Sequence, residues 1–239
     1  MENFADLYCD YLICSNSYTT ATGMASLLDI KHDKVTRALT QGDFDSKYLW
    51  KQAKVYVKEL TQSKEIITLS FDDSIEEKRY TDESELVCWH FDHVFGKSVK
   101  GINFLSALLE IGDMRIPVGV EFIKKDIFVE DSKTRKEKRK SSVTKNELFR
   151  NMLRECYRKM HFNYVLADSW YSSIENMICC KVECKSDFIM ALKSNRLVAL
   201  SSEDKVNEKY ISIETLQPGQ QTVEIWLKEL DFPLLLILS

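Results

Sequence analysis

The spacing of hydrophobic residues divides the chain into a helical beginning and a longer part that mixes strands and helices. Up to residue 42, apolar residues recur at helical spacing and predict three short helices joined by tight turns. Thr19 or Thr20 is the expected N-cap of the second helix, Asp33 that of the third, and Gly42 should end the third. This pattern fits a helix-turn-helix module, and it fits equally a small helical bundle that only packs on the rest of the protein.

Three strands are predicted in the first part of the longer region. Apolar and polar residues alternate over 67–71, which predicts a strand that ends at Asp72 and Asp73. The nearly continuous apolar run at 102–111 predicts a central strand buried on both faces. Alternation over 116–122 predicts a third strand, joined to the second by a tight turn.

Helices and strands alternate further along the chain. Thr144 and Glu147 form a capping box before a strongly amphipathic helix, and Ser172 and Glu175 form another before a second helix. Between the two helices, four mostly apolar residues predict a buried strand that ends at Asp168. A further strand follows the second helix. Strands that later alternate with helices indicate an α/β protein with a mixed sheet.

Composition narrows the classes of function. The 239 residues are 44% hydrophobic with only three prolines, which indicates a globular protein with a real core. The net charge of −4 means that a nucleic-acid partner would need a local basic patch. Seven cysteines without an evident disulfide framework suit a reducing compartment, and the chain starts with no signal peptide. With no apolar run long enough to cross a bilayer, we expect a cytoplasmic protein without a membrane partner.

Basic residues form clusters that could contact DNA phosphates. From Lys133 to Lys145 the chain carries seven basic residues against one acidic residue. A solvated loop explains this run as well as phosphate contact does. The candidate DNA-binding residues are Lys31, Lys34, Arg37, Lys97, Lys100, Lys133, Arg135, Lys136, Lys138, Arg139 and Lys140.

The aspartates at the ends of two predicted core strands are the main candidates for chemistry. If the strands of Asp72 and Asp168 are neighbours, their carboxylates converge at one edge of the sheet and repel each other unless a cation lies between them. Mg²⁺ commonly takes one or two carboxylates together with substrate phosphates. Two such ions about 3.5–4 Å apart can activate a water and stabilise the leaving oxygen of a phosphodiester. Aspartates at strand ends also serve as simple turn or cap residues, so spacing alone leaves both interpretations open.

Five blocks of sequence, in order, resemble the DDE transposases of bacterial insertion sequences. The blocks are FDDS, WHFDHVFGKSVKGINFLSALL, IPVGVEF, YVLADSWYSS and FIMALKSNR. The resemblance implies an RNase H-like mixed sheet flanked by helices over residues 61–239, after a helix-turn-helix-like DNA-binding module over residues 1–60. It also implies two aspartates and a glutamate that bind Mg²⁺ (or Mn²⁺), cut double-stranded DNA at transposon ends and join it to a target. A homodimer is compatible with this family.

Carried onto this sequence, the resemblance implies that Asp72 and Asp168 are the first two catalytic and metal-binding residues. Asp72 matches an Asp-x-Thr/Ser pattern through Ser74, and Asp73 is the fallback within the doublet. The third residue of the family, a glutamate in a Tyr-Arg-Glu-Lys signature, has no counterpart here. The remaining candidates lie on expected strands or turns: Glu208, Glu214, Glu224 and Glu229.

The last segment, FPLLLILS, predicts a core strand with no element after it, which suggests a chain that is incomplete at its C-terminus. We therefore expect a transposase that is weakly active or inactive because it lacks the third acidic residue. The alternative is a catalytically inactive DNA-binding remnant that occupies transposon ends. A pseudogene product without function is a third interpretation.

Three other features have ordinary structural explanations. His90 and His93 form an HxxH pair, but residues three apart on a strand face opposite sides, so local hydrogen bonding is a better account than zinc. Trp170 could stack on an unpaired base, and we expect it instead to pack in the core. Core packing is also expected of three cysteines on the second predicted helix: Cys179, Cys180 and Cys184.

Overall fold

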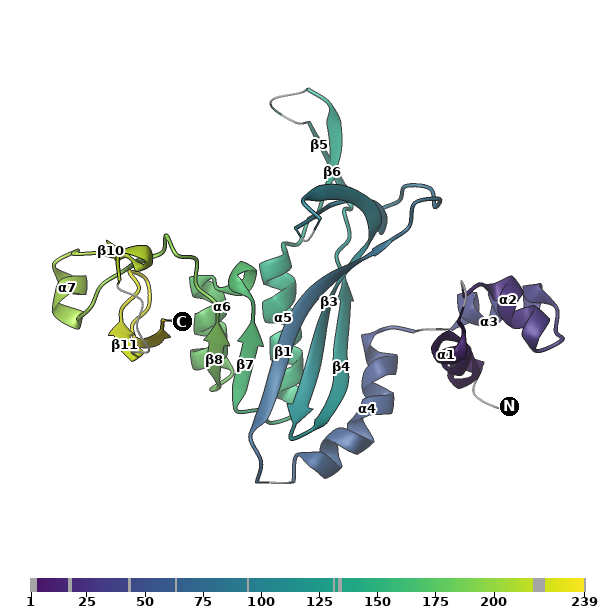
Figure 1. Ribbon diagram of the computed structural model, residues 1–239, viewed down its shortest axis with the longest axis horizontal. Coiled ribbons are helices and arrows are strands. Elements are labelled where there is room, and N and C mark those ends of the chain that lie inside the picture. Colours follow the sequence, from purple (N-terminus) through teal and green to yellow (C-terminus); the bar gives the residue numbers. More distant parts are fainter. Residues whose placement is uncertain are drawn as a thin grey trace. The chain divides into compact units, whose positions relative to one another are not determined.

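The computed structural model describes residues 4–16, 19–42, 44–62, 64–93, 95–130, 132, 135–216 and 222–238 (Figure 1). The chain separates into two compact units, Met1–Tyr48 and Leu49–Ser239. Helix α4 (Ser46–Leu60) begins in the first unit and lies mostly in the second.

The first unit contains the three predicted helices. They are α1 (Phe4–Cys14), α2 (Ala21–Leu27) and α3 (His32–Gln41). Met24, Ala25 and Val35 form the buried centre of this unit. Thr20 caps α2 by accepting a hydrogen bond from the Gly23 amide at 2.9 Å.

One expected cap in this unit is wrong. Lys31 occupies the N-cap position of α3, and Asp33 lies in the first turn of that helix. Its negative charge still suits this position, because it lies near the positive end of the helix dipole. Gly42 ends α3, as expected.

The second unit is built on a six-stranded mixed sheet, which confirms the predicted fold class. Its strands follow the order β2-β3-β1-β7-β8, and β4 pairs with β3. The pairs β1–β3, β2–β3 and β3–β4 are antiparallel, whereas β1, β7 and β8 run parallel. The strands are β1 (Ile67–Glu77), β2 (Val87–Asp92), β3 (Lys97–Ile111), β4 (Met114–Phe122), β7 (Tyr164–Ala167) and β8 (Asp187–Met190).

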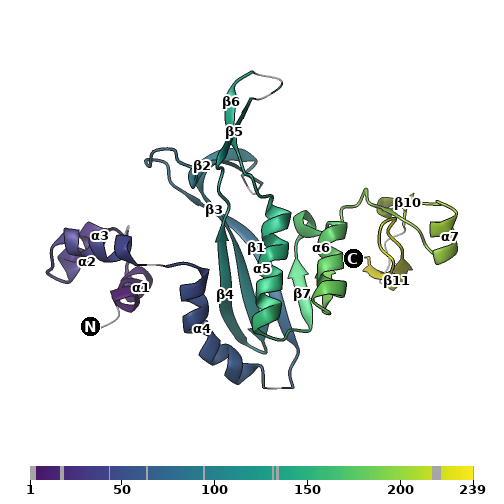
Figure 2. The same ribbon diagram turned by 180° about the vertical axis from the view of Figure 1, so that it is seen from behind.

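Helix α5 (Lys145–Lys159) covers one face of this sheet (Figures 1 and 2). Its buried residues enter the same core as those of β1 and β3, and the Phe149 ring lies 4.6 Å from the ring of Phe71. The predicted capping box is present: Thr144 accepts from the Glu147 amide, and the Glu147 side chain accepts from the Thr144 amide.

The structure corrects two predictions about the central strands. β1 continues to Glu77, so Asp72 and Asp73 lie inside the strand rather than at its end. The reason is that β3 is long enough to pair with β1 all the way to Glu77. In β3, buried and half-buried positions alternate from Val99 to Ile111, so this strand is not buried on both faces.

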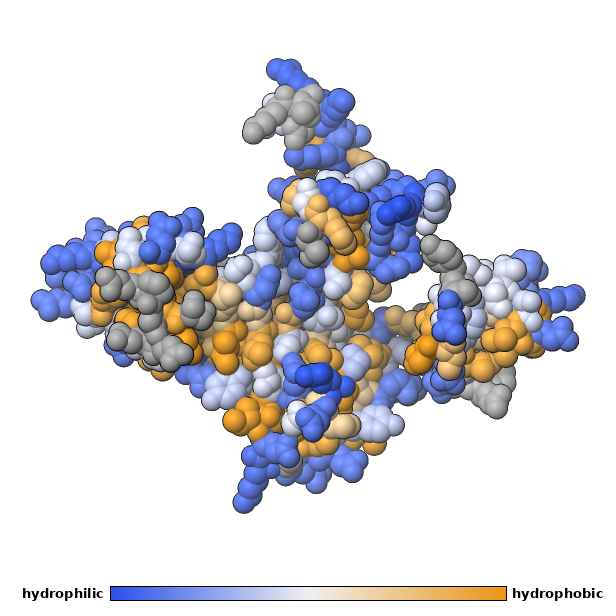
Figure 3. Space-filling view, in the orientation of Figure 1, coloured by the Kyte–Doolittle hydropathy of each residue, from blue (hydrophilic) through white to orange (hydrophobic). Residues whose placement is uncertain are grey.

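The basic run after residue 132 is partly a strand and not only a loop. β5 (Ile127–Glu130) and β6 (Glu137–Lys140) form an antiparallel hairpin. Arg139 on β6 pairs with Phe128 on β5, and its guanidinium lies 4.4 Å from the centre of the Phe128 ring. Arg139 also forms an ion pair with Glu83, which lies outside the hairpin. The hairpin projects at the top of Figure 3, where most of its coloured surface is hydrophilic.

The expected capping box of Ser172 and Glu175 is wrong, and a simple N-cap one residue later begins the helix. Ser173, not Ser172, caps α6 (Ile174–Ile178) and accepts from the Asn176 amide. The Ser172 hydroxyl is engaged elsewhere, because it donates to the Ser169 carbonyl oxygen at 2.8 Å. α6 continues as a π-helical turn, η2 (Cys179–Glu183), and the three cysteines at 179, 180 and 184 are buried as expected.

The last part of the chain forms small sheets instead of extending the main sheet. Its elements are β9 (Leu197–Val198), α7 (Ser202–Val206), β10 (Ile211–Ser212), η3 (Ile213–Thr215), β11 (Thr222–Ile225) and β12 (Leu234–Ile237). The apolar segment at the end was expected to be a core strand, but among the described residues β12 pairs with β11 alone. Leu235 and Ile237 are consequently exposed. Within the described residues, no helix is long and apolar enough to span a membrane.

Candidate active site

Asp72 and Asp168 lie level with each other on neighbouring parallel strands. β1 and β7 pair with Phe71 opposite Ala167, so the next residue on each strand is an aspartate. Asp168 keeps an extended backbone, with φ −75° and ψ −179°. Because side chains alternate across a strand, both carboxylates project from the sheet face opposite to Phe71, which packs against α5. The structure therefore brings together the two aspartates that sequence reasoning selected.

The surroundings of Asp72 are electronegative. Its side chain is exposed, yet partial burial raises the pKa of its carboxyl group, and the nearby negative charges of Asp73 and Asp168 raise that pKa further. A hydrogen bond with the Asp73 backbone and the positive charge of Lys145 act in the opposite direction. The Ser106 hydroxyl from β3 donates to the Asp72 carbonyl oxygen at 3.1 Å. A cation bound beside Asp72 would relieve the repulsion between these carboxylates.

Asp73 faces the other side of the sheet and is held by two partners. Lys145 Nζ lies 2.6 Å from its Oδ2, and the Tyr171 hydroxyl donates to its Oδ1 at 2.9 Å. Lys145 is the first residue of α5, and Tyr171 lies in the 3₁₀ turn η1 (Ser169–Tyr171) that follows Asp168. Burial and the negative charge of Asp73 raise the pKa of Tyr171. Asp73 thus connects β1 to the start of α5 and to the turn after β7.

Sequence reasoning did not identify Lys145 and Tyr171 as partners of Asp73. The available signals were weak: Lys145 follows the capping residue Thr144, and Tyr171 lies three residues after Asp168. Only the pairing of β1 with β7 and the packing of α5 bring the three side chains together.

Asp168 also stabilises the turn that follows it. Its Oδ1 accepts a hydrogen bond from the Trp170 amide at 3.0 Å. The capped turn directs Trp170 outward, so this side chain is 47% exposed and the expectation of core packing is wrong. The Trp170 ring centre lies 5.6 Å from Lys145 Nζ and 5.6 Å from the His93 ring.

The two histidines of the HxxH pair have different surroundings. His90 is buried, and its Nε2 lies 3.2 Å from Cys88 Sγ. Burial, reinforced by the charges of Lys125 and Lys145, lowers the pKa of His90 to about 4. His93 is exposed and lies against the rings of Phe91 and Trp170.

The donor set of the site fits a hard divalent cation. Carboxylate oxygens are the ligands that Mg²⁺ and Mn²⁺ prefer, and one or two of them suffice where substrate phosphates complete the coordination. In the part of the chain that the structure describes, no three His, Cys, Asp or Glu side chains form a group that could hold a metal.

The four glutamates considered as the third acidic residue are spread over the last part of the chain. Glu208 follows α7 and lies 3.5 Å from Lys228, and Glu214 is in η3. Glu224 is on β11, and Glu229 lies between β11 and β12. Among the described residues, none of the four joins Asp72 and Asp168 in a metal-binding group.

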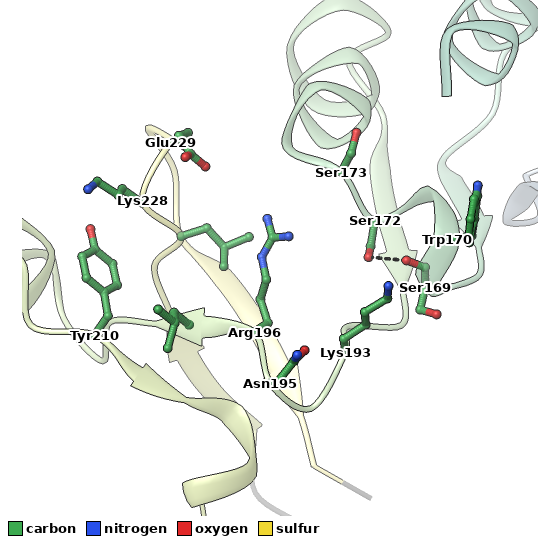
Figure 4. A pocket seen from close by; sticks show the side chains of 12 residues that line it. Ser169, Trp170, Ser172, Ser173, Lys193, Asn195, Arg196, Tyr210, Lys228 and Glu229 are labelled. Atoms are coloured by element: carbon green, nitrogen blue, oxygen red, sulfur yellow. Dashed lines mark hydrogen bonds between the residues drawn. The ribbon is translucent and has the colours of Figure 1, made fainter. Parts of the chain in front are cut away.

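A cavity of about 620 Å³ begins directly after Asp168 (Figure 4). One wall is the turn with Ser169 and Trp170, and the opposite side is formed by residues after β8 and after β11. Its polar and aromatic lining includes Lys193, Arg196, Tyr210 and Lys228.

The candidate DNA-binding residues lie on separate elements. Lys31, Lys34 and Arg37 are exposed on or beside α3, in the first unit. Lys97 and Lys100, at the start of β3, lie opposite Asp92 and Trp89 of β2 and line a second cavity, of about 190 Å³. The β5–β6 hairpin carries Arg135, Lys136, Lys138, Arg139 and Lys140. Lys133 lies outside the described residues.

Comparisons with known proteins show what this chain is similar to. A family model described as DDE superfamily endonuclease matches residues 1–210. The structure is similar to "Drosophila P element transposase strand transfer complex", with 10% identity, a TM-score of 0.35, and coverage of 87% of this chain and 49% of that chain. It is also similar to the Mos1 strand transfer complex, with 10% identity, a TM-score of 0.27, and coverage of 80% and 58%. The chain thus spans about half the length of these transposase chains. No curated protein matches it.

Proposed function

This chain belongs to the DDE superfamily endonucleases, and on that premise we propose that Asp72 and Asp168 hold a divalent cation, Mg²⁺ or Mn²⁺, at which DNA is cut. The observation that carries the proposal is the parallel register of β1 and β7, which places both carboxylates level on one face of the sheet. The expected substrate is double-stranded DNA at the ends of a mobile element, cleaved and then joined to a target.

The residues of the site have two roles: some bind the cation, and others hold the carboxylates in position. When bound, the cation supplies charge neutralisation at the phosphodiester and activation of the attacking oxygen. Asp72 and Asp168 provide the oxygen ligands. Asp73, held by Lys145 and Tyr171, keeps β1 in place against α5 and the turn after β7, so it positions Asp72 without facing the same side.

Other parts of the chain are proposed to hold the DNA. Residues 61–239 would form the catalytic domain and residues 1–60 a DNA-binding module, with Lys34 and Arg37 exposed on its third helix. In the catalytic domain, Lys138 and Lys140 are exposed on the β5–β6 hairpin. Each lysine that contacts a phosphate would release a counterion from the DNA, and this release contributes affinity that does not depend on the base sequence.

The test is nicking of a supercoiled plasmid by the full chain with and without Mg²⁺ or Mn²⁺. Asp72→Asn and Asp168→Asn should each lower the metal-dependent rate more than about 100-fold, because even the outer partners of metal ligands are worth 10–100-fold. Asp113→Asn is the matched control: this aspartate is exposed in the turn between β3 and β4, and its substitution should leave the rate unchanged. Nicking that survives Asp168→Asn, or that Asp113→Asn abolishes equally, would contradict the proposal.

A second candidate function is DNA binding without cleavage. It is favoured by the finding that, in the described ranges, two carboxylates share the candidate site and no third acidic side chain joins them. This function predicts salt-sensitive DNA binding by the wild-type chain but no metal-dependent nicking. The plasmid assay, run beside a binding assay on the same DNA, separates the two functions.

A further inference from the structure

The cavity of about 620 Å³ is lined by segments that follow the carboxyl ends of two parallel strands. β7 and β8 are parallel neighbours, so the segments that leave their carboxyl ends emerge at the same edge of the sheet. Ser169 and Trp170 follow β7, whereas Lys193 and Arg196 follow β8, and all four line the cavity. In open α/β sheets, the carboxyl ends of the strands are the end of the sheet at which ligands bind.

The charged residues of the cavity suit an anion. Lys193, Arg196 and Lys228 line it against a single acidic residue, Glu229. Lys228 lies 3.5 Å from Glu208, whereas neither Lys193 nor Arg196 has an ion-pair partner among the residues that the structure describes. In Figure 4 the Arg196 guanidinium points into the cavity, and the Lys193 side chain extends toward the turn at Ser169 and Ser172. Two cations aimed into one cavity match the charge of a phosphate.

The rest of the lining suits a flat, partly apolar group. Trp170 and Tyr210 contribute aromatic rings, and Leu197 and Leu227 contribute aliphatic surface. Aromatic rings beside cations bind the bases and phosphates of unpaired nucleic acid. The volume lies within the roughly 300–1,000 Å³ of small-molecule sites, which is enough for one nucleotide.

We infer that this cavity binds one phosphate-bearing nucleotide of an unpaired DNA strand, with the phosphate between Lys193 and Arg196. The inference rests on the proposed function, because it takes the strand to be one that passes Asp72 and Asp168. A free nucleotide offers the same chemistry. The strand is favoured because one wall of the cavity starts at Ser169, the residue that directly follows Asp168 in the chain.

The inference is tested by binding of a fluorescein-labelled oligothymidylate of about 8 nucleotides to the full chain without metal, followed by fluorescence anisotropy over a range of salt concentrations. Lys193→Gln and Arg196→Gln should each weaken binding about tenfold, and each should reduce the slope of log affinity against log salt by about 0.7. Lys209→Gln is the matched control, because Lys209 is exposed in the same part of the chain but does not line the cavity. Equal losses for Lys209→Gln and Lys193→Gln, or no loss for either cavity variant, would overturn the inference.

A competition experiment distinguishes a nucleotide within a DNA strand from a free nucleotide. Thymidine monophosphate should displace the oligonucleotide only weakly, since it brings no neighbouring phosphates. If it competes as strongly as unlabelled oligonucleotide, the cavity is a free-nucleotide site and the inference about the DNA strand is wrong. Failure of this binding test leaves metal-dependent plasmid nicking unaffected, and failure of the nicking test leaves this binding unaffected, so the two proposals fail separately.

Discussion

At the scale of single residues, the informative contrast is between the adjacent aspartates of β1. Sequence reasoning selected Asp72 over Asp73 only through a motif match, because a doublet does not reveal which carboxylate faces which side. The structure gives Asp73 two bonded partners on the α5 side and leaves Asp72 level with Asp168. The difference arises from strand pairing and helix packing between residues some 70 to 100 positions apart in the chain.

Tyr171→Phe tests whether the hydrogen bond to Asp73 contributes to stability. The substitution removes the hydroxyl that donates to Asp73 but keeps the buried ring, which stacks on Phe149 at 5.3 Å. Losing a hydrogen bond to a half-buried carboxylate should lower the free energy of unfolding by roughly 1.5–3 kcal/mol, measured by urea denaturation. Tyr80→Phe is the control, since Tyr80 is 99% exposed, and it should change stability by less than about 0.5 kcal/mol. Equal stability of the Tyr171 variant and wild type would show that this bond adds nothing.

Trp170 shows why the burial of some side chains was predicted wrongly from the sequence. An aromatic residue after a buried strand is usually a core residue, and hydrophobicity alone supports that expectation. Its actual position depends on Asp168 accepting from the Trp170 amide, which turns the chain immediately after the strand. The pattern of hydrophobic residues does not predict a local hydrogen bond of this kind.

At the scale of elements, periodicity and capping signals predicted most of what the structure contains. The three N-terminal helices, α5 with its capping box, and the strand before Asp168 follow from local sequence. The β5–β6 hairpin was not predicted, because its stabilising contacts join Arg139 to Phe128 and Glu83. β12 was misassigned because a run of leucines is compatible with any buried strand, whichever sheet it joins.

Gly101 determines how closely β3 can approach β1. A Cβ at this position would lie 2.3 Å from the Glu76 carbonyl oxygen, and backbone atoms cannot move aside without breaking the pairing of Gly101 with Glu77. Gly101→Ala should therefore lower the free energy of unfolding by about 2 kcal/mol or more, measured by thermal and urea denaturation. At Gly119 in β4, a Cβ would meet only side-chain atoms, the nearest being the flexible Met152 Sδ at 3.3 Å. Gly119→Ala should cost less, and a cost equal to that of Gly101→Ala would argue against the backbone clash.

At the scale of the whole molecule, the sequence established the class of fold but not the roles of its basic segments. Alternating strands and helices predicted the mixed sheet, and that sheet is present. The basic run after residue 132 could have been a solvated loop, and the placement of Lys138, Arg139 and Lys140 on strand β6 depends on contacts outside the run. The net charge of −4 does not reveal the basic segments, because it sums over the whole chain and says nothing of local positive surfaces.

The hairpin provides a prediction about DNA binding by the full chain. Lys138 and Lys140 are exposed on β6, and Arg139 between them contacts Phe128 and Glu83. The double variant Lys138→Gln/Lys140→Gln should weaken binding to duplex DNA and reduce the slope of log affinity against log salt by about 1.8, because each phosphate contact contributes about 0.9.

The control for this prediction removes the same charge elsewhere. Lys64→Gln/Lys209→Gln changes two exposed lysines away from the hairpin. Both double variants should fold with wild-type stability. If the control reduces the salt slope as much as the hairpin variant does, the effect reflects total charge and the hairpin has no special role.

The neighbouring aspartates of β1 also affect how errors in strand pairing are tolerated. If β1 slipped by one residue along β7, Asp73 would take the place of Asp72 beside Asp168, and a pair of carboxylates would persist. The same slip would put Asp72 where Phe71 now packs, against Phe149 in the core. Burying a carboxylate there without a partner costs several kcal/mol. The hydrophobic face of β1 thus fixes the register of the face that carries Asp72. A chain paired out of register could keep two carboxylates together, but the buried carboxylate would destabilise its core.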